Sequence, residues 1–236
     1  MAKEVELQVK IIAMTMDAER ICAAAARQCY SPGNAVEIYH QITSQQVSDT
    51  LAHCIRSGHL AVLSAASATV AINVTRECLT QLNTHAFVKT VTQSQQYVNH
   101  RDFGYHVVDP YREDLEQLDR FVWFMDLVQK EYNWHRDKFI GRGYTAEQAN
   151  EYARMCLTNA NEANIVLSAN FWGWYTWLNR RACNRNTFTT LKLSTRILKL
   201  FRENWPLIFG RCGPDCQLHG CTEGKPCGDP YHGRVI

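Results

Sequence analysis

The feature that most restricts the fold of this chain is the segment 112–143, REDLEQLDRFVWFMDLVQKEYNWHRDKFIGRG. Its apolar residues recur at helical spacing and it ends at a glycine, so it is predicted to form one long amphipathic helix. Two further helix patterns occupy residues 44–58 and 187–205; Gly58 stops the first and Pro206 stops the second. The chain is therefore expected to be dominated by helices.

Strand patterns are few. Apolar and polar residues alternate from Val5 to Ile11, and residues 67–74 are β-branched and apolar, so each segment is predicted to form a strand. Apolar and polar side chains also alternate in residues 88–92, which are expected to form a strand. Strands and helices do not alternate regularly along the chain. The predicted fold class is α+β, helix-dominated with a small, mostly antiparallel sheet.

Shorter helices are expected between these elements. One follows Asp17, taken as its N-cap, through residue 29, and a helical patch covers residues 75–82. Thr145 and Gln148 have the spacing of a capping box, which predicts a helix that begins at residue 146.

Composition limits the class of protein. The chain has 236 residues, of which 46% are apolar, enough for one sizeable core. We expect a catalytic domain at residues 1–208 and an extension at 209–236 that is rich in Cys, Gly and Pro and too polar to form its own core. The formal net charge of +2 gives no reason to expect a nucleic acid polymer as partner.

The sequence shows neither a membrane span nor a signal peptide. No apolar run approaches the length of a membrane span, so no membrane partner is expected. The N-terminus MAKEVELQVK is charged and does not fit a signal peptide. A cytoplasmic location is expected, where most of the ten cysteines would be free core thiols.

The segment 81–99, QLNTHAFVKTVTQSQQYVN, carries no carboxylate and is rich in amides and hydroxyls. Amides can pair with the edge of a nucleobase, and Phe87 and Tyr97 can stack on a ring. A solvated edge strand is the alternative interpretation. The composition of this strip indicates a nucleotide-like ligand.

Residues that together form the pattern of a known protein family extend along most of the chain. They are AARQCYS at 25–31, the Gly58-His59 step, Thr69, Gln81, the triplet Thr84-His85-Ala86 followed after seven residues by Ser94, Tyr97, YARMCL around Arg154, and WLNRRA with Arg181. In this order and spacing the sequence resembles the flavin-dependent thymidylate synthase family over roughly residues 5 to 205.

The resemblance implies a fold, an activity and an assembly. Family members are homotetramers with active sites at subunit interfaces. They bind FAD, reduce it with NADPH, and transfer the methylene of methylenetetrahydrofolate to C5 of dUMP without a cysteine nucleophile. Positions that would bind the flavin are Cys29, Thr69, His85, Phe87, Lys89, Asn170 and Arg185. Positions that would bind the nucleotide are Gln81, Ser94, Gln95, Gln96, Tyr97, Arg154 and Arg181.

Arg181 and Arg154 are the predicted catalytic residues. A guanidinium offers a planar fork that fits phosphate and pyrimidine oxygens, which Lys does not reproduce. At a carbonyl of the base it would stabilise negative charge as C5 becomes nucleophilic. The alternatives are a surface ion pair for each Arg and a core histidine for His85.

The sequence departs from the family signature Arg-His-Arg. Thr84 and Ala86 replace both arginines, and Lys89, where a Ser is usual, is expected to restore one charge. Further replacements are Ala65 for a His, Trp172 for an Arg, Gln96 for an Arg and Thr92 for a carboxylate.

These departures indicate a shifted substrate or lost activity. Thr92, Gln95 and Gln96 are neutral donors and acceptors that suit a ribose 2′-hydroxyl, so UMP is a candidate acceptor beside dUMP. With its divergent triplet Thr84-His85-Ala86, the sequence resembles the branch of the family that methylates UMP in nucleoside-antibiotic (polyoxin-type) pathways. A catalytically silent flavin- or nucleotide-binding homologue and a C5-hydroxymethylase are the alternatives that stay open.

The tail cysteines Cys212, Cys216, Cys221 and Cys227 are spaced by four, five and six residues. Only the first pair meets the spacing of a zinc knuckle. Zinc binding, disulfides and unliganded thiols all stay open, and no metal site is assigned from the sequence.

Overall fold

The computed structural model describes residues 1–216 and 220–228. Contacts within the chain divide it into two compact units. The first comprises Met1–Gln8, Ile72–Leu82 and Val91–Val166, and the second comprises Val9–Ala71, Asn83–Thr90 and Leu167–Ile236. Among the described residues, no helix is both long enough and apolar enough to cross a membrane.

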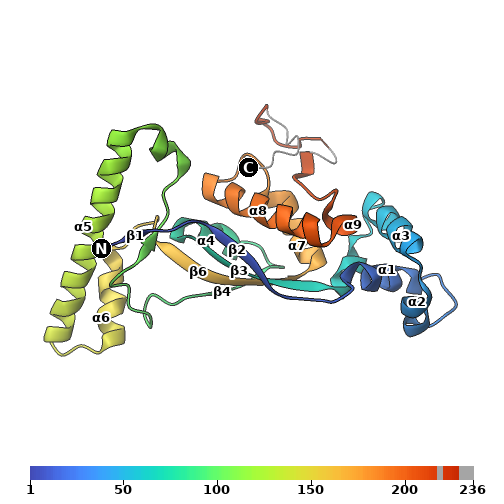
Figure 1. Cartoon of the computed structure of the whole chain (residues 1–236), viewed down its shortest axis with the longest axis horizontal. Helices are drawn as coiled ribbons and strands as arrows, with labels where there is room; N and C mark the ends of the chain where they lie inside the picture. The colour runs from blue at the N-terminus through green and yellow to red at the C-terminus, as the bar shows by residue number, and fades with distance from the viewer. Residues whose placement is uncertain (217–219, 229–236) are drawn as a thin grey trace. The chain divides into compact units, whose positions relative to one another are not determined.

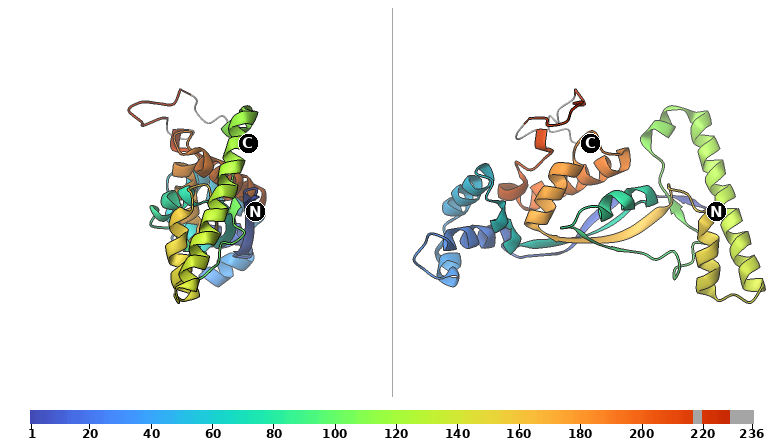
Figure 2. Two further views of the ribbon diagram at one scale, coloured as in Figure 1. Left: turned by 90° about the vertical axis from the view of Figure 1, so that its left-hand side faces the viewer. Right: turned by 180° about the vertical axis from the view of Figure 1, so that it is seen from behind.

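The first unit is built on a helical hairpin. Helix α5 (Leu115–Gly141) packs along α6 (Ala146–Ala153), as Figures 1 and 2 both show. Asp114 caps α5 by accepting hydrogen bonds from two backbone N–H groups. The predicted capping box of Thr145 and Gln148 is present and begins α6. The sequence prediction of a long helix followed by a capped one is confirmed.

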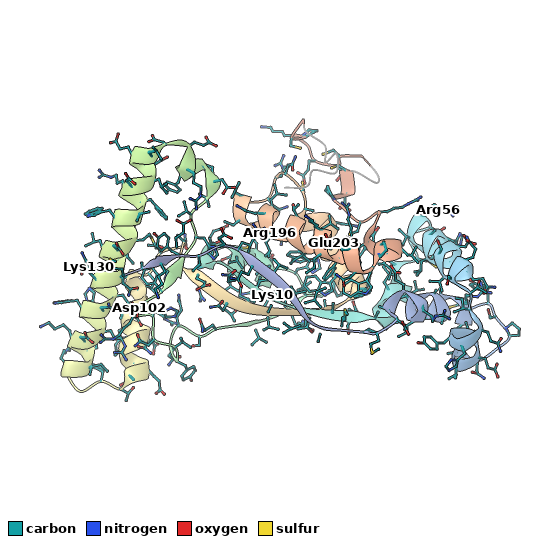
Figure 3. All side chains as sticks on the ribbon, viewed as in Figure 1. Lys10, Arg56, Asp102, Lys130, Arg196 and Glu203 are labelled. Atoms are coloured by element: carbon teal, nitrogen blue, oxygen red, sulfur yellow. The ribbon has the colours of Figure 1, made fainter. Side chains whose placement is uncertain are left out.

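A buried apolar cluster of the first unit includes part of α5. Its buried members are Phe103, Tyr105, Met125 and Val128. Figure 3 shows side chains along the whole of α5, where the exposed Lys130 is labelled. The unit also contains β1 (Lys3–Glu4), paired in parallel with β5 (Gly104–Tyr105), and the short helices η2 (Asp109–Glu113) and η3 (Arg154–Cys156).

The second unit has an aromatic core. Helices α7 (Phe171–Arg181), α8 (Phe188–Asn204) and α9 (Pro206–Phe209) lie close together (Figure 1). Phe171, Trp174, Phe201 and Phe209 are fully buried among them, and the indole of Trp174 donates to the carbonyl of Ala68 at 2.9 Å. As predicted, α8 ends before Pro206, which itself begins α9 because its fixed φ suits a first helical position.

The N-terminal helices of the second unit correct one prediction. They are α1 (Ala18–Gln28), α2 (Ala35–Gln41), α3 (Ser44–Arg56) and the short η1 (Leu60–Ala65). Asp17 does precede α1, but its φ is 48° and its side chain makes no capping bond. Its carboxylate accepts a hydrogen bond from the Tyr39 hydroxyl at 3.0 Å instead.

The main sheet has the strand order β2-β3-β6-β4. The strands are β2 (Gln8–Met14), β3 (Ser67–Thr75), β6 (Glu162–Asn170) and β4 (Lys89–Thr92). The first predicted strand is displaced toward the C-terminus and the next two are confirmed, as is the α+β class with a small antiparallel sheet. β6 and α7 were not predicted, although buried and less buried residues alternate along β6. Helix α4 (Arg76–Asn83) follows β3.

Candidate functional site

The junction of β6 and α7 positions the triplet Thr84-His85-Ala86 in the second unit. Asn170 caps α7 by accepting a hydrogen bond from Gly173 N at 2.8 Å. A Cβ at residue 173 would lie 3.0 Å from the carbonyl oxygen of Phe87. Glycine therefore lets the first turn of α7 approach the backbone beside the triplet. The cap occupies the side-chain oxygen of Asn170, one of the predicted flavin ligands.

Arg181 lies at the opposite end of α7 and also reaches the triplet. Its Nη2 donates to Thr84 Oγ1 at 2.6 Å, and its Nη1 donates to Asn186 Oδ1 at 3.3 Å. Thr84 stands where the family signature has its first arginine. A hydroxyl at this position accepts a hydrogen bond from Arg181, whereas a second guanidinium would repel it.

His85 is the buried member of the triplet. It is 7% exposed, and its Nδ1 has no hydrogen-bond partner among the described residues. Burial lowers the pKa of His85, and the charges of Arg180 and Arg181 lower it further, so the imidazole is neutral at pH 7. A buried polar atom without a partner costs about 1–3 kcal/mol. This nitrogen is therefore a strong indication of a ligand in the second unit.

Phe87 lies beside His85, and Trp172 lies beside Phe87. The ring of Phe87 meets the imidazole edge-on at 5.9 Å and lies 4.8 Å from the ring of Trp172. Trp172 replaces a family arginine, so an aromatic contact takes the place of a positive charge. Phe87 keeps half of its surface exposed, which leaves an apolar face available for a flat ligand.

The other predicted flavin ligands are spread over the second unit. The hydroxyls of Thr69 and Ser168 lie 3.1 Å apart on neighbouring strands. Lys89 is exposed at the start of β4, and Cys29 is exposed just after α1. In the part of the chain that the structure describes, neither makes a hydrogen bond or ion pair with the triplet.

Arg185 is bound by the C-terminal tail. It donates to the carbonyl of Lys225, and its Nε lies 3.6 Å from a carboxylate oxygen of Glu223. These contacts occupy a guanidinium that the resemblance assigns to the flavin.

The predicted nucleotide ligands of the first unit form a turn. The hydroxyl of Ser94 accepts hydrogen bonds from the backbone N–H of Gln96 at 3.2 Å and of Tyr97 at 3.4 Å. Gln95 is buried, whereas Tyr97 is 70% exposed. The turn therefore presents one aromatic ring to solvent and holds its amides against the protein. Gln81, on α4, is half-buried.

Helix α6 fixes this turn. The side chain of Asn150 donates to the carbonyl of Gln96 at 3.0 Å and accepts from Arg136 at 2.7 Å. The amide of Gln96, which replaces a family arginine, donates to the carboxylate of Glu151 at 3.4 Å. These supporting residues were not predicted from the sequence, because they bind the turn and not a ligand.

Arg154 has a cationic neighbour that the sequence analysis missed. Burial lowers the pKa of Arg76, and the charge of the half-buried Arg154 lowers it further. Neither guanidinium forms an ion pair with a carboxylate in the described residues. An anion would relieve the repulsion between the two positive charges. The available signal was the position of Arg76 at the start of the helical patch that leads into the strip.

His100 was also missed. It is 8% exposed and its Nε2 has no partner among the described residues. Burial and then the charge of Arg76 lower the pKa of His100, while the charge of Glu162 raises it.

Each unit holds part of the set of site residues that was predicted from the sequence. His85, Phe87, Asn170 and Arg181 come together in the second, and the Ser94 turn and Arg154 belong to the first.

Comparison with known proteins identifies the family. Residues 10–207, most of the chain, match the family model described as "Thymidylate synthase complementing protein". The chain belongs to this family. The flavin-dependent thymidylate synthase of Clostridium tetani is 28% identical and the alignment covers 96% of this chain and 95% of the relative. That of Geobacter sulfurreducens is 30% identical, with 94% of each chain covered.

A solved structure shows the same fold. The UMP/dUMP methylase PolB from Streptomyces cacaoi, bound with 5-Br dUMP, superimposes with a TM-score of 0.71 over 89% of this chain and 96% of that one. Its sequence identity is 12%. The fold expected from the resemblance is therefore confirmed, and the family member is a divergent one.

Proposed function

We propose that this protein transfers a one-carbon unit from methylenetetrahydrofolate to C5 of a uridine monophosphate, UMP or dUMP, and releases the 5-methyl nucleotide. FAD would be its cofactor and NADPH its reductant. Membership of the thymidylate synthase family supports methylation of dUMP at C5 in general. The observation that carries the proposal is the buried, unpartnered Nδ1 of His85 within the triplet.

The second unit offers groups that fit a flavin. The neutral imidazole of His85 has one donor and one acceptor nitrogen, and the edge of a flavin ring offers both acceptors and a donor. The exposed face of Phe87 beside Trp172 suits a flat ring, and Thr69 and Lys89 supply a hydroxyl and a positive charge. When bound, the flavin would carry the electrons from NADPH to the one-carbon unit.

The first unit offers groups that fit a nucleotide. Arg154 and Arg76 supply positive charge for the phosphate, and exposed Tyr97 can stack on a base. Arg181 belongs to the second unit. Independently of the first unit's groups, we assign it to a carbonyl of the uracil ring, where it would stabilise the negative charge that develops as C5 attacks. A donor of this kind contributes roughly 2.7–4 kcal/mol to the barrier reduction.

The proposal includes the ribonucleotide UMP as an acceptor beside dUMP. Gln96 is bound to Glu151, so recognition of a 2′-hydroxyl would fall to Thr92 and Gln95. PolB is named for both UMP and dUMP, which supports a family member that accepts either sugar.

Tritium release from UMP and dUMP labelled at C5 tests the function directly. The assay contains FAD, NADPH and methylenetetrahydrofolate, and the released label reports substitution at C5. Release from either nucleotide supports the proposal, and faster release from UMP supports the ribonucleotide preference. No release from either, with FAD shown to bind, would contradict it.

That negative result would favour a second candidate, a silent flavin-binding homologue. Thr84, Ala86 and Trp172 replace three family arginines, and the tail occupies Arg185, so positive charge near the flavin is reduced. A purified protein that is yellow but inactive is the expected outcome for this candidate.

We also propose a homotetramer, as in the family. Trp123, Leu127 and Trp134 are exposed at helical spacing on one face of α5, as expected for a surface that another copy covers. Light scattering of the purified protein should give four times the mass of the 27.1 kDa chain. A monomer that carries full activity would contradict the assembly.

A further inference from the structure

A cavity of about 510 Å³ lies in the second unit, between the end of α7 and the C-terminal tail. Four cysteines line it: Cys183, Cys216, Cys221 and Cys227. Cys183 belongs to the connection between α7 and α8, and the other three follow α9. Thiols from separate parts of the sequence therefore line a single cavity.

This set differs from the one that the sequence analysis grouped. Cys212 is fully buried, and its thiol donates to the carbonyl of Tyr175 at 3.8 Å. Burial raises its pKa far above the usual value, so it stays a protonated core thiol. Cys183, 33 residues before Cys216, takes its place at the cavity.

The described part of the tail contacts Arg185. Residues 220–228 are exposed and form no helix or strand. Arg185 binds the carbonyl of Lys225 and pairs with Glu223, but an exposed ion pair contributes only about 0–1 kcal/mol. A segment without an apolar core generally needs a disulfide or a metal to fix it.

The backbone around two of these cysteines has an unusual conformation. Gly220, just before Cys221, has a φ of +82°, and Gly228, just after Cys227, has a φ of +72°. A Cβ at either glycine would meet no atom within 4 Å, so conformation and not space requires glycine there. Left-handed turns of this kind direct backbone N–H groups toward an anionic centre, as around metal-bound thiolates.

We propose that Cys183, Cys216, Cys221 and Cys227 bind a thiophilic divalent metal ion, Zn²⁺, as four thiolates. The ion would attach the tail to the connection after α7. Each thiol loses its proton on binding, and the four-thiolate complex carries two negative charges. Arg180 and Arg185 line the same cavity, together with the carboxylates of Asp215 and Glu223. Arg185 pairs with Glu223, so Arg180 is the cation available to offset part of the negative charge of the complex.

Binding requires the tail to move. Among the described residues, no three His, Cys, Asp or Glu side chains are already placed to hold one metal ion. A zinc–sulfur bond is about 2.3 Å long, so the thiols must converge. The segment that carries Cys221 and Cys227 is the one without helix or strand, whereas the carbonyl of Cys183 is fixed by Asn186. The tail thiols would therefore move toward Cys183.

Metal analysis of the full chain, purified under reducing conditions, tests the proposal. We expect about one zinc per chain. Cobalt added to the zinc-free protein should give the thiolate charge-transfer and tetrahedral ligand-field bands of a four-sulfur site. Cys183→Ser and Cys227→Ser should each lower the zinc content roughly tenfold or more.

Cys156→Ser is the matched control, since it removes a thiol of the first unit; it should retain zinc. The cobalt spectrum of the unaltered chain keeps the test decisive if a variant fails to fold. Absence of zinc together with absence of cobalt–thiolate bands would overturn the proposal. So would retention of zinc in both cavity variants, or a thiol titration that finds these cysteines paired in disulfides.

Discussion

The triplet of the second unit and the Ser94 turn of the first have both lost family arginines, but they differ in what remains. Around the triplet, Thr84 accepts from Arg181 and Trp172 packs on Phe87, so neutral contacts fill the vacated positions. Near the turn, Gln96 is bound to Glu151, yet the first unit keeps the guanidiniums of Arg76 and Arg154 without carboxylate partners in the described residues.

The difference separates two kinds of recognition. A flavin at the triplet would be held by an imidazole, aromatic faces and hydroxyls, whereas Arg181 beside the triplet is assigned to the uracil ring. A ligand in the first unit would be attracted mainly by charge. Variants that exchange these properties should therefore affect the flavin and the nucleotide separately.

The largest effect is expected from Arg181→Ala. It removes the cation assigned to the uracil carbonyl, so the rate of tritium release should fall roughly 10²–10³-fold. Arg56→Ala, an exposed arginine on α3 that Figure 3 labels, is the matched control and should keep the full rate. Equal rates of tritium release in both variants would contradict a catalytic role for Arg181.

A smaller effect is expected from Ala86→Arg, which restores one signature arginine at an exposed position. A charge-assisted hydrogen bond to the flavin phosphates should lower the Kd for FAD about tenfold. Quenching of flavin fluorescence measures it. Ala35→Arg adds the same charge at the start of α2 and should leave the Kd unchanged. If both variants lower the Kd for FAD equally, the triplet is not the FAD-binding site.

On the nucleotide side, Asn150→Ala removes the hydrogen bond to the carbonyl of Gln96. The Ser94 turn would lose one support, and the KM for the nucleotide should rise roughly two- to tenfold. The Kd for FAD should stay the same. A change in FAD affinity with an unaltered KM would reverse the assignment of the two regions.

The smallest effect concerns pH. His85 and His100 are buried, and each has a folded-state pKa below its ordinary value. In the unfolded chain these histidines have a pKa of about 6.5, so below that pH the unfolded chain binds protons that the folded chain does not. The free energy of unfolding should therefore fall as the pH is lowered from about 6.5 to the folded-state pKa. Thermal unfolding across this range measures it. The fall should be smaller in His85→Asn, and an unchanged slope would mean that His85 is not buried as neutral imidazole.

The sequence predicted those features that depend on local pattern. The long helix α5, the capping box at Thr145 and the end of α8 before Pro206 follow from spacing and from the chemistry of single residues. Likewise the order of matching residues, including His85 and Arg181, was enough to predict the family.

Features that depend on tertiary contact were not accessible in this way. Asp17 bonds to Tyr39 instead of capping α1, because the fold brings that hydroxyl close. Arg76 gains its significance from Arg154, 78 residues later, and Cys183 from a cavity that the tail closes. The strand β6 is different: the alternation of polar and apolar residues was present in the sequence, but residues 162–170 were assigned no element.

The close approach at Gly173 has a consequence for how this site can change. A Cβ there would press on the carbonyl of Phe87 and on its side chain at 3.1 Å, so even alanine would displace the segment that carries His85. Substitution at this position would shift the imidazole without altering any group that touches a ligand. Randomised libraries aimed at a new acceptor should therefore keep residue 173 fixed and place their diversity at exposed positions such as Ala86 and Tyr97.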